Sequence, residues 1–277
     1  MAASTVLITG CSSGIGYCVA HGLQARGDRV FATARKQADV DRLAGEGLES
    51  LQLDLDDSAS IEAAVSDILS RTGGTLDAVF HNGAYGQAGA VEDLSRAVLR
   101  RQFETNLFGW HELTNRVLPV MRAQGHGRII YNSSVLGFVA MRFRGAYNAS
   151  KYAVEGLVDT LRLELHGTNI QVSLIEPGPI SSRFRQNALR SFQQNIDSQH
   201  SPHADTYEQL ESRLAQEGPA VPFTLPPEAV LKCVIHALDS RRPKDRYFVT
   251  FPTYLFAYLK RALPGRWLDR ILVKAGG

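Results

Sequence analysis

Two residues capable of acid–base chemistry stand four positions apart, Tyr147 and Lys151 in the run Tyr-Asn-Ala-Ser-Lys. In a helix, that spacing places the phenol and the ammonium on the same face. A phenol with a reference pKa of about 10 is almost fully protonated at neutral pH, so a nearby cation that favours the phenolate helps it to exchange protons. We therefore predict that Lys151 lowers the pKa of Tyr147 and that Tyr147 transfers a proton.

Ser134 is a third polar group, thirteen residues before Tyr147 in Asn132-Ser133-Ser134. It follows an apolar run that is typical of a strand, and the carboxyl ends of parallel strands face the ligand crevice of open α/β sheets. Its hydroxyl could hydrogen-bond a substrate oxygen. A lone serine there is more often a turn residue, and a lone Tyr–Lys pair is more often on the surface, so the prediction rests on the combination.

A glycine-rich segment follows the first apolar run, from Thr9 to Gly16. Its glycines let the backbone turn tightly and approach a pyrophosphate, whose charge then lies at the positive end of the following helix. The alternative is a turn that only links strand and helix, but the position after the first strand favours a dinucleotide. The oxidised nicotinamide would bring a second cation to Tyr147. The residues assigned to the cofactor here are Gly10, Ser12, Ser13, Gly14, Ile15 and Gly16.

The end of the second expected strand reads Thr33-Ala34-Arg35-Lys36. A carboxylate at this place grips the ribose 2′-hydroxyl of NAD, whereas an arginine accommodates the 2′-phosphate of NADP. Arg35, with Ser12 or Lys36, can pair with that phosphate, so the sequence favours NADP, and NADPH over NADH. The alternative is a solvated strand end.

These residues need a scaffold, and the sequence predicts one in which short apolar runs alternate with longer stretches of helical period. That alternation indicates an α/β protein, a Rossmann-type doubly wound parallel sheet of about seven strands with helices on both faces. The strands are expected at Thr5–Thr9, Arg29–Ala34, Ser50–Leu53, Ala78–His81, Arg128–Asn132, Gln171–Ile175 and Arg246–Thr250.

Helical patterns lie between these runs. Ile15, Val19 and Leu23 share one face of a first helix, with Gly27 after its end. After Tyr147, a buried amphipathic helix is predicted from Ala153, Leu157, Leu161 and Leu165, with Val154 and Val158 beside them. We expect one domain over residues 1–277, with a mobile substrate flap over 181–227 that holds a short helix near 206–215, and an amphipathic tail over 252–277.

Composition excludes several classes of protein. The 277 residues carry 30 Lys and Arg against 28 Asp and Glu, a net charge of +2 that does not suggest nucleic-acid binding. The three cysteines show no metal or disulfide spacing, and His200 and His203 have no accompanying ligands, so no metal is expected. The first residues lack the basic region of a signal sequence, and no run is long enough to span a membrane. We therefore expect a cytoplasmic protein.

Together these motifs resemble the short-chain dehydrogenase/reductase family, in its single-domain branch, over roughly residues 5–182. The resemblance implies Tyr147 as acid and base, Lys151 as ribose anchor and pKa modifier, Ser134 as carbonyl partner and Asn106 as holder of a relay water. It implies cofactor contacts from Asp54 and Leu55 at the adenine, Asn82 at the adenine ribose and Ile180 at the nicotinamide carboxamide. The motif residues that carry it are Thr9–Gly16, Asn82-Gly83-Ala84, Asn106, Ser134, Tyr147–Lys151 and Pro177-Gly178-Pro179-Ile180.

The chain departs from the family pattern at two places. The usual Asn-Asn-Ala-Gly is His81-Asn82-Gly83-Ala84, and the usual threonine after Pro-Gly is replaced by Ser182. The first change keeps small residues at the adenosine side and the second keeps a hydroxyl, so we expect cofactor binding to survive. His81 lies in the fourth expected strand, where a packed histidine is favoured over a base.

The expected substrate walls, residues 135–146 and the flap, are apolar, with Leu136, Phe138 and Phe184 among them. They favour a lipophilic aldehyde or ketone. Together with the segment from Arg246 to Arg266, they resemble bacterial aldehyde and ketone reductases and, more distantly, retinol and 17β-hydroxysteroid dehydrogenases. Arg142 and Arg144 keep an acidic or carrier-bound substrate as an alternative. The sequence is also compatible with a steroid or retinoid alcohol dehydrogenase working in the oxidative direction, and with a non-catalytic protein that senses NADP.

The tail raises a separate question. Its five cations against Asp269 suggest a weak membrane-surface contact, although packing on the core or a subunit contact is favoured because Pro264-Gly265 interrupts the pattern. By family analogy, we expect a homodimer or homotetramer.

Overall fold

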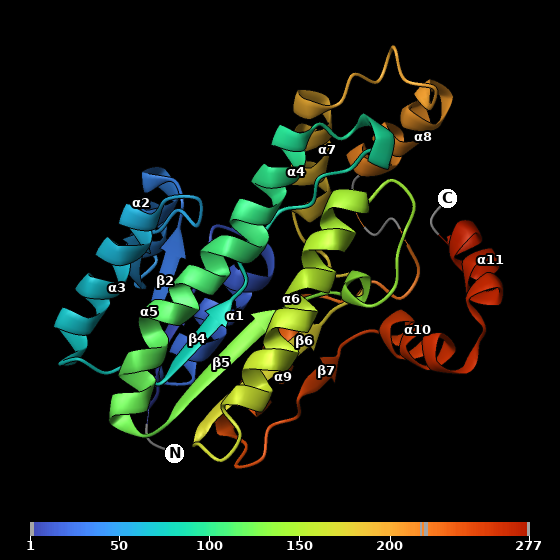
Figure 1. The fold of residues 1–277 in the computed structure, drawn as a ribbon. Helices are drawn as coiled ribbons and strands as arrows, with labels where there is room; N and C mark the ends of the chain where they lie inside the picture. The colour runs from blue at the N-terminus through green and yellow to red at the C-terminus, as the bar shows by residue number, and fades with distance from the viewer. Residues whose placement is uncertain (1–2, 217, 219–220, 276–277) are drawn as a thin grey trace.

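Seven strands form one parallel sheet in the order β3-β2-β1-β4-β5-β6-β7 (Figure 1). The computed structural model describes residues 3–216, 218 and 221–275. All neighbouring strands are parallel, so each connection crosses over a face of the sheet. The strands are β1 Thr5–Ile8, β2 Arg29–Ala34, β3 Glu49–Gln52, β4 Ala78–His81, β5 Gly127–Asn132, β6 Ile170–Glu176 and β7 Arg246–Phe248.

The strand prediction is confirmed, with ends that move by one or two residues. The order reverses direction at β1, with β2 on one side and β4 on the other, which is the switch point where open α/β sheets bind ligands. The carboxyl ends of β1, β4, β5 and β6 lead directly into Thr9, Asn82, Ser133 and Pro177. The sheet therefore brings the predicted motifs to one edge.

Helices cover both faces of the sheet (Figure 1). On one face α3, α5 and α6 pack against Leu7, Val79 and Ile129, and on the other α1, α2 and α9 pack against Val6 and Ile8. Their bounds are α1 Gly14–Ala25, α2 Gln37–Gly45, α3 Ser58–Thr72, α5 Gly109–Gln124, α6 Gly145–Glu164 and α9 Glu228–Asp239.

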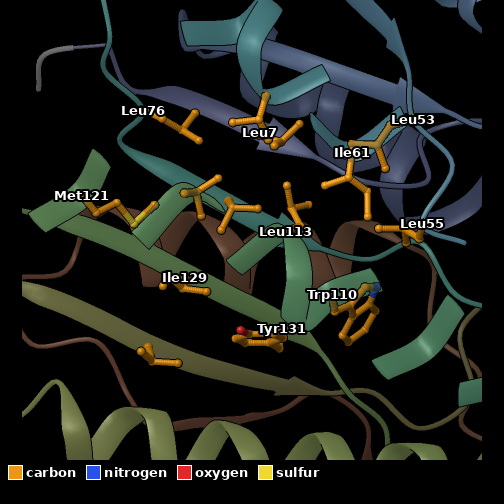
Figure 2. Packing of buried hydrophobic residues seen from close by; sticks show 14 of the residues in the cluster. Leu7, Leu53, Leu55, Ile61, Leu76, Trp110, Leu113, Met121, Ile129 and Tyr131 are labelled. Carbon is orange, nitrogen blue, oxygen red and sulfur yellow. The ribbon is translucent and has the colours of Figure 1, made fainter. Parts of the chain in front are cut away.

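The first of these two cores contains Trp110, the largest fully buried side chain of the described residues (Figure 2). Trp110 of α5 is 1% exposed and donates through Nε1 to the Gly83 carbonyl at 2.8 Å. Tyr131 of β5 and His81 of β4 stack with ring centroids 4.5 Å apart, and Thr114 joins them by hydrogen bonds. Burial lowers the pKa of His81 to about 3, so this histidine is neutral and packed.

Helix α6 turns a different face inward from the one that its leucines suggested. Val154 and Val158 are buried, but Leu157 is exposed and Leu161 is only half-buried. The predicted buried face is therefore correct at Val154, Val158 and Leu165 and wrong at Leu157. The inward face instead follows Tyr147, Lys151, Val154, Glu155 and Val158, because the polar residues have partners beneath the helix.

The flap contains more helix than the sequence indicated. Helix α7 (Phe184–Asn195) was not expected, and α8 (Ala204–Ala215) begins two residues before the short predicted helix. Both pack with Ala88 and Ala90 in a small core beside α4 (Arg96–Phe103) (Figure 1). Tyr207 of α8 donates to the Asp93 carboxylate, which anchors this part of the flap. The polar composition hid α7 because its buried face consists only of Ala188 and Phe192.

The tail forms two helices, α10 (Phe251–Ala262) and α11 (Gly265–Ala275), separated at Pro264. They lie beyond β7 at the edge of the molecule (Figure 1). Among the described residues, none of the helices has both the length and the apolar character needed to cross a membrane.

Candidate active site

The first turns of α6 place two predicted chemical groups inside the protein. Tyr147 is 8% exposed and Lys151 is 1% exposed, one turn apart on the inward face. The Tyr147 ring lies edge-on to Phe184 of the flap, with centroids 5.2 Å apart. The Lys151 ammonium lies 5.7 Å from the Tyr147 ring centroid and 4.3 Å from the Trp110 ring centroid.

In the protein alone Tyr147 is not made more acidic, and the prediction that Lys151 and an oxidised nicotinamide together lower its pKa concerns the complex with the coenzyme and stays a prediction. Burial raises the pKa of Tyr147 to about 12, and only a hydrogen bond with Ser134 and the nearby Arg144 guanidinium act against burial. The physical reason is that the desolvation free energy of the phenolate is larger than the stabilisation of the phenolate by these two neighbours. Tyr147 is therefore a protonated phenol, ready to donate.

Lys151 is held in place by the sheet. Its Nζ donates to the main-chain carbonyl of Asn132 at 2.8 Å, at the end of β5. Burial lowers the pKa of Lys151 to about 7, and the carboxylate of Glu155, one turn further along α6, counters that shift. The charge on Lys151 therefore depends on its neighbours, which the spacing of Tyr147 and Lys151 alone did not indicate.

Asn106 reaches the site from a π-helical segment, η2 (Glu104–Phe108), between α4 and α5. Its side chain donates to the carbonyl of Tyr85 at 3.0 Å and to Oγ of Ser150 at 3.2 Å, and it accepts from the Tyr85 amide. Ser150 in turn donates to the carbonyl of Tyr147. Asn106 is fully buried and joins the first turn of α6 to the loop after β4. A π-turn often marks a functional position in a helix.

Ser134 follows β5 and lies beside Tyr147. Its Oγ accepts from the Leu136 amide at 3.1 Å and thereby caps the short helix η3 (Val135–Gly137). The amide of Val135 donates to the Pro177 carbonyl at 2.9 Å, which fixes this loop to the one after β6. The structure thus brings Asn106, Ser134, Tyr147 and Lys151 into one connected site.

The glycine loop after β1 has the shape of a phosphate cradle. Gly10 and Gly14 have positive φ angles of 72° and 61°. A Cβ on Gly16 would lie 2.3 Å from the Gly10 carbonyl oxygen, so only glycine allows α1 to start so close to the strand. Ser13 does not cap α1 with its side chain, which leaves the amide donors of the first turn for an anion. These features fit a dinucleotide pyrophosphate.

Asn82 holds the glycine loop in place by hydrogen bonds. Its Nδ2 donates to the carbonyls of Thr9 and Gly10, and its Oδ1 accepts from Asn132. A Cβ on Gly10 would lie 2.6 Å from the Cα of Gly83, so glycine at position 10 lets the two loops approach closely. The altered family motif at residues 81–84 therefore still fits beneath the phosphate loop.

The adenosine side is lined by charges that the sequence only partly indicated. Arg35 is exposed at the end of β2, and its main-chain carbonyl accepts from Gln52. Asp54 is half-buried and Leu55 is buried after β3. Two residues on this side were not predicted. Arg42 donates to the Ser12 carbonyl at 2.7 Å. Asp56 accepts from Thr105 at 2.6 Å and interacts electrostatically with the positive charge of Arg35.

The segment after β6 closes the site on its other side. Pro177 is buried, and Gly178 packs against Thr250. Ile180 pairs with Leu225 in an isolated parallel bridge, and Ser182 lies directly against Gly14. The segment after Pro177 therefore runs from the expected nicotinamide end of the site back to the phosphate loop.

A buried ion cluster lies behind Lys151. Arg246 of β7 binds the carboxylates of Glu155, Glu176 and Asp159, and Ser133 also donates to Glu155. Burial and the neighbouring Glu155 raise the pKa of Glu176 to about 8. This cluster was not predicted, because its members lie far apart in the sequence. Among the described residues, no group of three His, Cys, Asp or Glu side chains could hold a metal ion.

This fold and this site define an oxidoreductase that uses a nicotinamide dinucleotide. Residues 4–192 match the family model for short chain dehydrogenases, and the chain belongs to the short-chain dehydrogenase/reductase family. It acts on CH–OH or C=O groups and depends on NAD(P).

Several relatives resemble the chain over most of its length. Uncharacterized oxidoreductase YbbO from Escherichia coli K12 is 43% identical, over 97% of this chain and 93% of its own. The NADPH-dependent 3-dehydrocapnine reductase of Ornithobacterium rhinotracheale is 30% identical, over 97% and 95%. Human 17-beta-hydroxysteroid dehydrogenase type 1 is 32% identical, over 90% and 78%. Among solved structures, an actinorhodin polyketide ketoreductase with NADPH is 27% identical, with a TM-score of 0.71 over 89% and 95% of the two chains.

Proposed function

We propose that this protein uses NADPH to reduce a lipophilic aldehyde or ketone to the alcohol. The observation that carries the proposal is the state of Tyr147, which is buried, protonated and hydrogen-bonded to Ser134. Burial raises the pKa of this phenol to about 12, so it carries its proton, the form that gives a proton to the carbonyl oxygen in the reductive direction.

A dinucleotide held by the glycine loop after β1 would supply a hydride to the carbonyl carbon. Ser134 donates a hydrogen bond to the carbonyl oxygen, and Tyr147 gives that oxygen its proton, so the C=O double bond becomes CH–OH. The ammonium of Lys151 then stabilises the phenolate left on Tyr147. Asn106 holds the carbonyl of Tyr85 and the first turn of α6 in place during this transfer.

Arg35 supports NADPH as the coenzyme. It is exposed at the end of β2, where the chain has no carboxylate in the same position. The loop glycines with Ser12, Ser13, Ile15, Asp54, Leu55, Asn82, Pro177, Gly178, Ile180 and Ser182 complete the proposed dinucleotide site. One relative is named as NADPH-dependent, in agreement with this choice.

Aromatic side chains support a lipophilic substrate. Phe184 lies edge-on to Tyr147, and the ring centroids of Phe138 and Phe248 lie 5.9 Å apart. Phe143 contacts His203 and Tyr207 of the flap. Such walls suit a carbonyl compound with an apolar body.

Arg144 is the observation that favours a second type of substrate. Its guanidinium lies close enough to Tyr147 to oppose the rise in the tyrosine pKa, and burial lowers the pKa of Arg144 to about 10. A substrate with a carboxylate near its carbonyl would pair with this cation.

The experiment is an absorbance assay at the reduced-nicotinamide band, with both coenzymes and a panel of aliphatic, aromatic, retinoid and steroid carbonyls. We expect NADPH oxidation with a lipophilic carbonyl, and loss of that activity in Tyr147→Phe. Turnover confined to alcohols would favour the oxidative dehydrogenase. Tight NADPH binding without turnover of any compound would favour a sensor.

A further inference from the structure

Helix α10 leaves one apolar face uncovered. Its inward face is marked by Thr253 and Ala257, which are buried. The opposite face carries four large side chains at helical spacing, with exposed fractions between 40% and 68%: Phe251, Tyr254, Leu255 and Tyr258. Single exposed apolar residues are common, but a continuous stripe of aromatic residues indicates a surface that binds something.

Helix α11 adds a second uncovered apolar face together with a row of cations. Trp267 is 61% exposed and Ile271 is 38% exposed, one turn apart. Arg266, Arg270 and Lys274 follow at intervals of four, so they also share one side of the helix. The guanidinium of Arg270 lies 5.6 Å from the Trp267 ring centroid.

Charge is concentrated in this part of the chain. From residue 251 onward there are five cations and one acid, a net charge of +4, whereas the whole chain is only +2, so the remainder is net −2. We name the set of Phe251, Tyr254, Leu255, Tyr258, Arg266, Trp267, Arg270, Ile271 and Lys274 the tail surface.

The tail surface adjoins the segments that are expected to form the substrate wall. The ring centroid of Phe251 lies 4.9 Å from that of Phe223 in the flap, and the centroid of Tyr254 lies 5.4 Å from that of Phe248. Phe248 in turn contacts Phe138, just after Ser134. Lys260 of α10 donates to the Phe138 carbonyl, which ties the tail to this wall.

We propose that the tail surface binds the surface of an anionic lipid bilayer, with the protein remaining outside the hydrocarbon core. Tyrosine and tryptophan suit the boundary between water and acyl chains, and the cations complement acidic headgroups. A second copy of the chain is a poorer partner, because two copies of the +4 segment facing each other across a twofold axis would repel.

Membrane binding would also place the flap beside the bilayer. A lipophilic carbonyl dissolved in the lipid would then have a short path to the site, and this consequence rests on the proposed function. The proposal of membrane binding does not rest on the proposed function, because membrane binding is measured without coenzyme or turnover. Failure of one proposal is therefore distinguishable from failure of the other.

Tryptophan fluorescence gives a direct test. The chain has two tryptophans, Trp110, which is 1% exposed, and Trp267, which is 61% exposed, so a change on adding vesicles reports on the tail. With vesicles that contain phosphatidylglycerol, we expect a blue shift, quenching by brominated acyl chains and co-sedimentation. Phosphatidylcholine alone should bind weakly, and salt should release the protein. Absence of binding by the full chain would overturn the proposal.

Two pairs of variants separate charge and apolar contacts. Arg266→Glu with Arg270→Glu should lower vesicle partitioning tenfold or more, whereas Arg241→Glu with Arg242→Glu, an equal charge change at exposed positions outside the tail, should change it by less than about threefold. Trp267→Ala with Ile271→Ala should also weaken binding, while Leu157→Ala with Leu163→Ala on α6 should not.

Oligomeric state is measured on the same samples by light scattering. Equal losses of vesicle binding in a tail variant and in its control variant would contradict the proposal. The proposal would also be contradicted if the intact chain did not bind vesicles but formed a dimer that the tail variants dissociate. The tail surface would then be a subunit contact. Turnover of a water-soluble carbonyl should stay within about twofold in the tail variants, because none of these residues lies in the catalytic site.

Discussion

The Lys151 ammonium donates a hydrogen bond to the main-chain carbonyl of Asn132 at 2.8 Å, which ties the second turn of α6 to the carboxyl end of β5. Because Asn132 also donates to Asn82, which braces the phosphate loop, one chain of hydrogen bonds joins the lysine to the cofactor cradle. Chemistry and coenzyme binding are therefore positioned by the same strand end.

Tyr147→Phe should lower the rate of carbonyl reduction by two to four orders of magnitude, because the proton donor is removed. NADPH affinity should stay within a few fold, since the ring still fills its place against Phe184. Steady-state rates and a fluorescence titration with NADPH measure the two effects. Tyr152→Phe, on the exposed side of the same helix, serves as the control. Unchanged turnover in Tyr147→Phe would refute the assigned role.

Arg35→Ala should weaken NADPH binding by about ten- to a hundredfold, the value of charge-assisted hydrogen bonds to a phosphate. NADH binding should change little, because NADH has no 2′-phosphate. Dissociation constants for both coenzymes measure the difference, with Arg122→Ala, an exposed cation in the last turn of α5, as the control. Equal losses for NADPH and NADH would show that Arg35 does not recognise the phosphate.

Gly16→Ala should weaken both coenzymes alike, by about tenfold or more, because its Cβ would collide with the Gly10 carbonyl and displace the loop. Gly156→Ala on α6 has open space around its new Cβ and should leave binding unchanged. A calorimetric titration of each variant tests the contrast. Normal affinity in Gly16→Ala would mean that the loop does not approach the pyrophosphate.

The pH dependence of reduction should report on Lys151. Because the pKa of Lys151 is about 7, kcat/KM should fall as the pH rises above that value and the ammonium loses its proton. Glu155→Gln removes the carboxylate that favours the ammonium, so the fall should move to lower pH. The exposed Glu62→Gln is the control. A rate loss in Glu155→Gln without movement of the profile would indicate a purely structural role.

Arg246→Met should destabilise the fold by about 3–5 kcal/mol at alkaline pH, because Glu155 and Glu176 lose their buried cation. The pKa of Glu176 is raised from 4.5 to about 8, so the folded state binds more protons than the unfolded chain between these values, and stability falls as the pH rises through them. The loss in the variant should thus be smaller at acid pH, where the carboxyls are protonated.

Urea unfolding at several pH values measures this effect. Arg162→Met, whose ion pairs with Asp159 and Asp245 lie nearer the solvent, should change the free energy of unfolding by less than about 1 kcal/mol. Equal destabilisation of Arg246→Met at all pH values would argue against titration of the buried carboxyls.

Sequence reasoning predicted the sheet and most motif positions because these depend on local patterns. Apolar runs mark buried strands, and glycines mark the phosphate loop. It did not predict α7, whose short buried face leaves little periodicity, or the cluster of Glu155, Glu176 and Arg246, whose members meet only after the sheet and α6 have assembled. The burial that raises the pKa of Tyr147 in the protein alone could not be predicted either, since burial is a property of the folded chain.

The π-turn at residues 104–108 has a consequence for insertions and deletions. It adds one residue to what would otherwise be continuous α-helix from α4 to α5. Inserting a second extra residue there, beyond the one that the π-turn absorbs, would rotate α4 by about 100° relative to α5. Gln102 would then lose the Gln87 amide that it binds at 2.7 Å, and with it the route through Asn195 to α7. An insertion at this joint should therefore detach the flap from α4, although the sequence would still contain every catalytic residue.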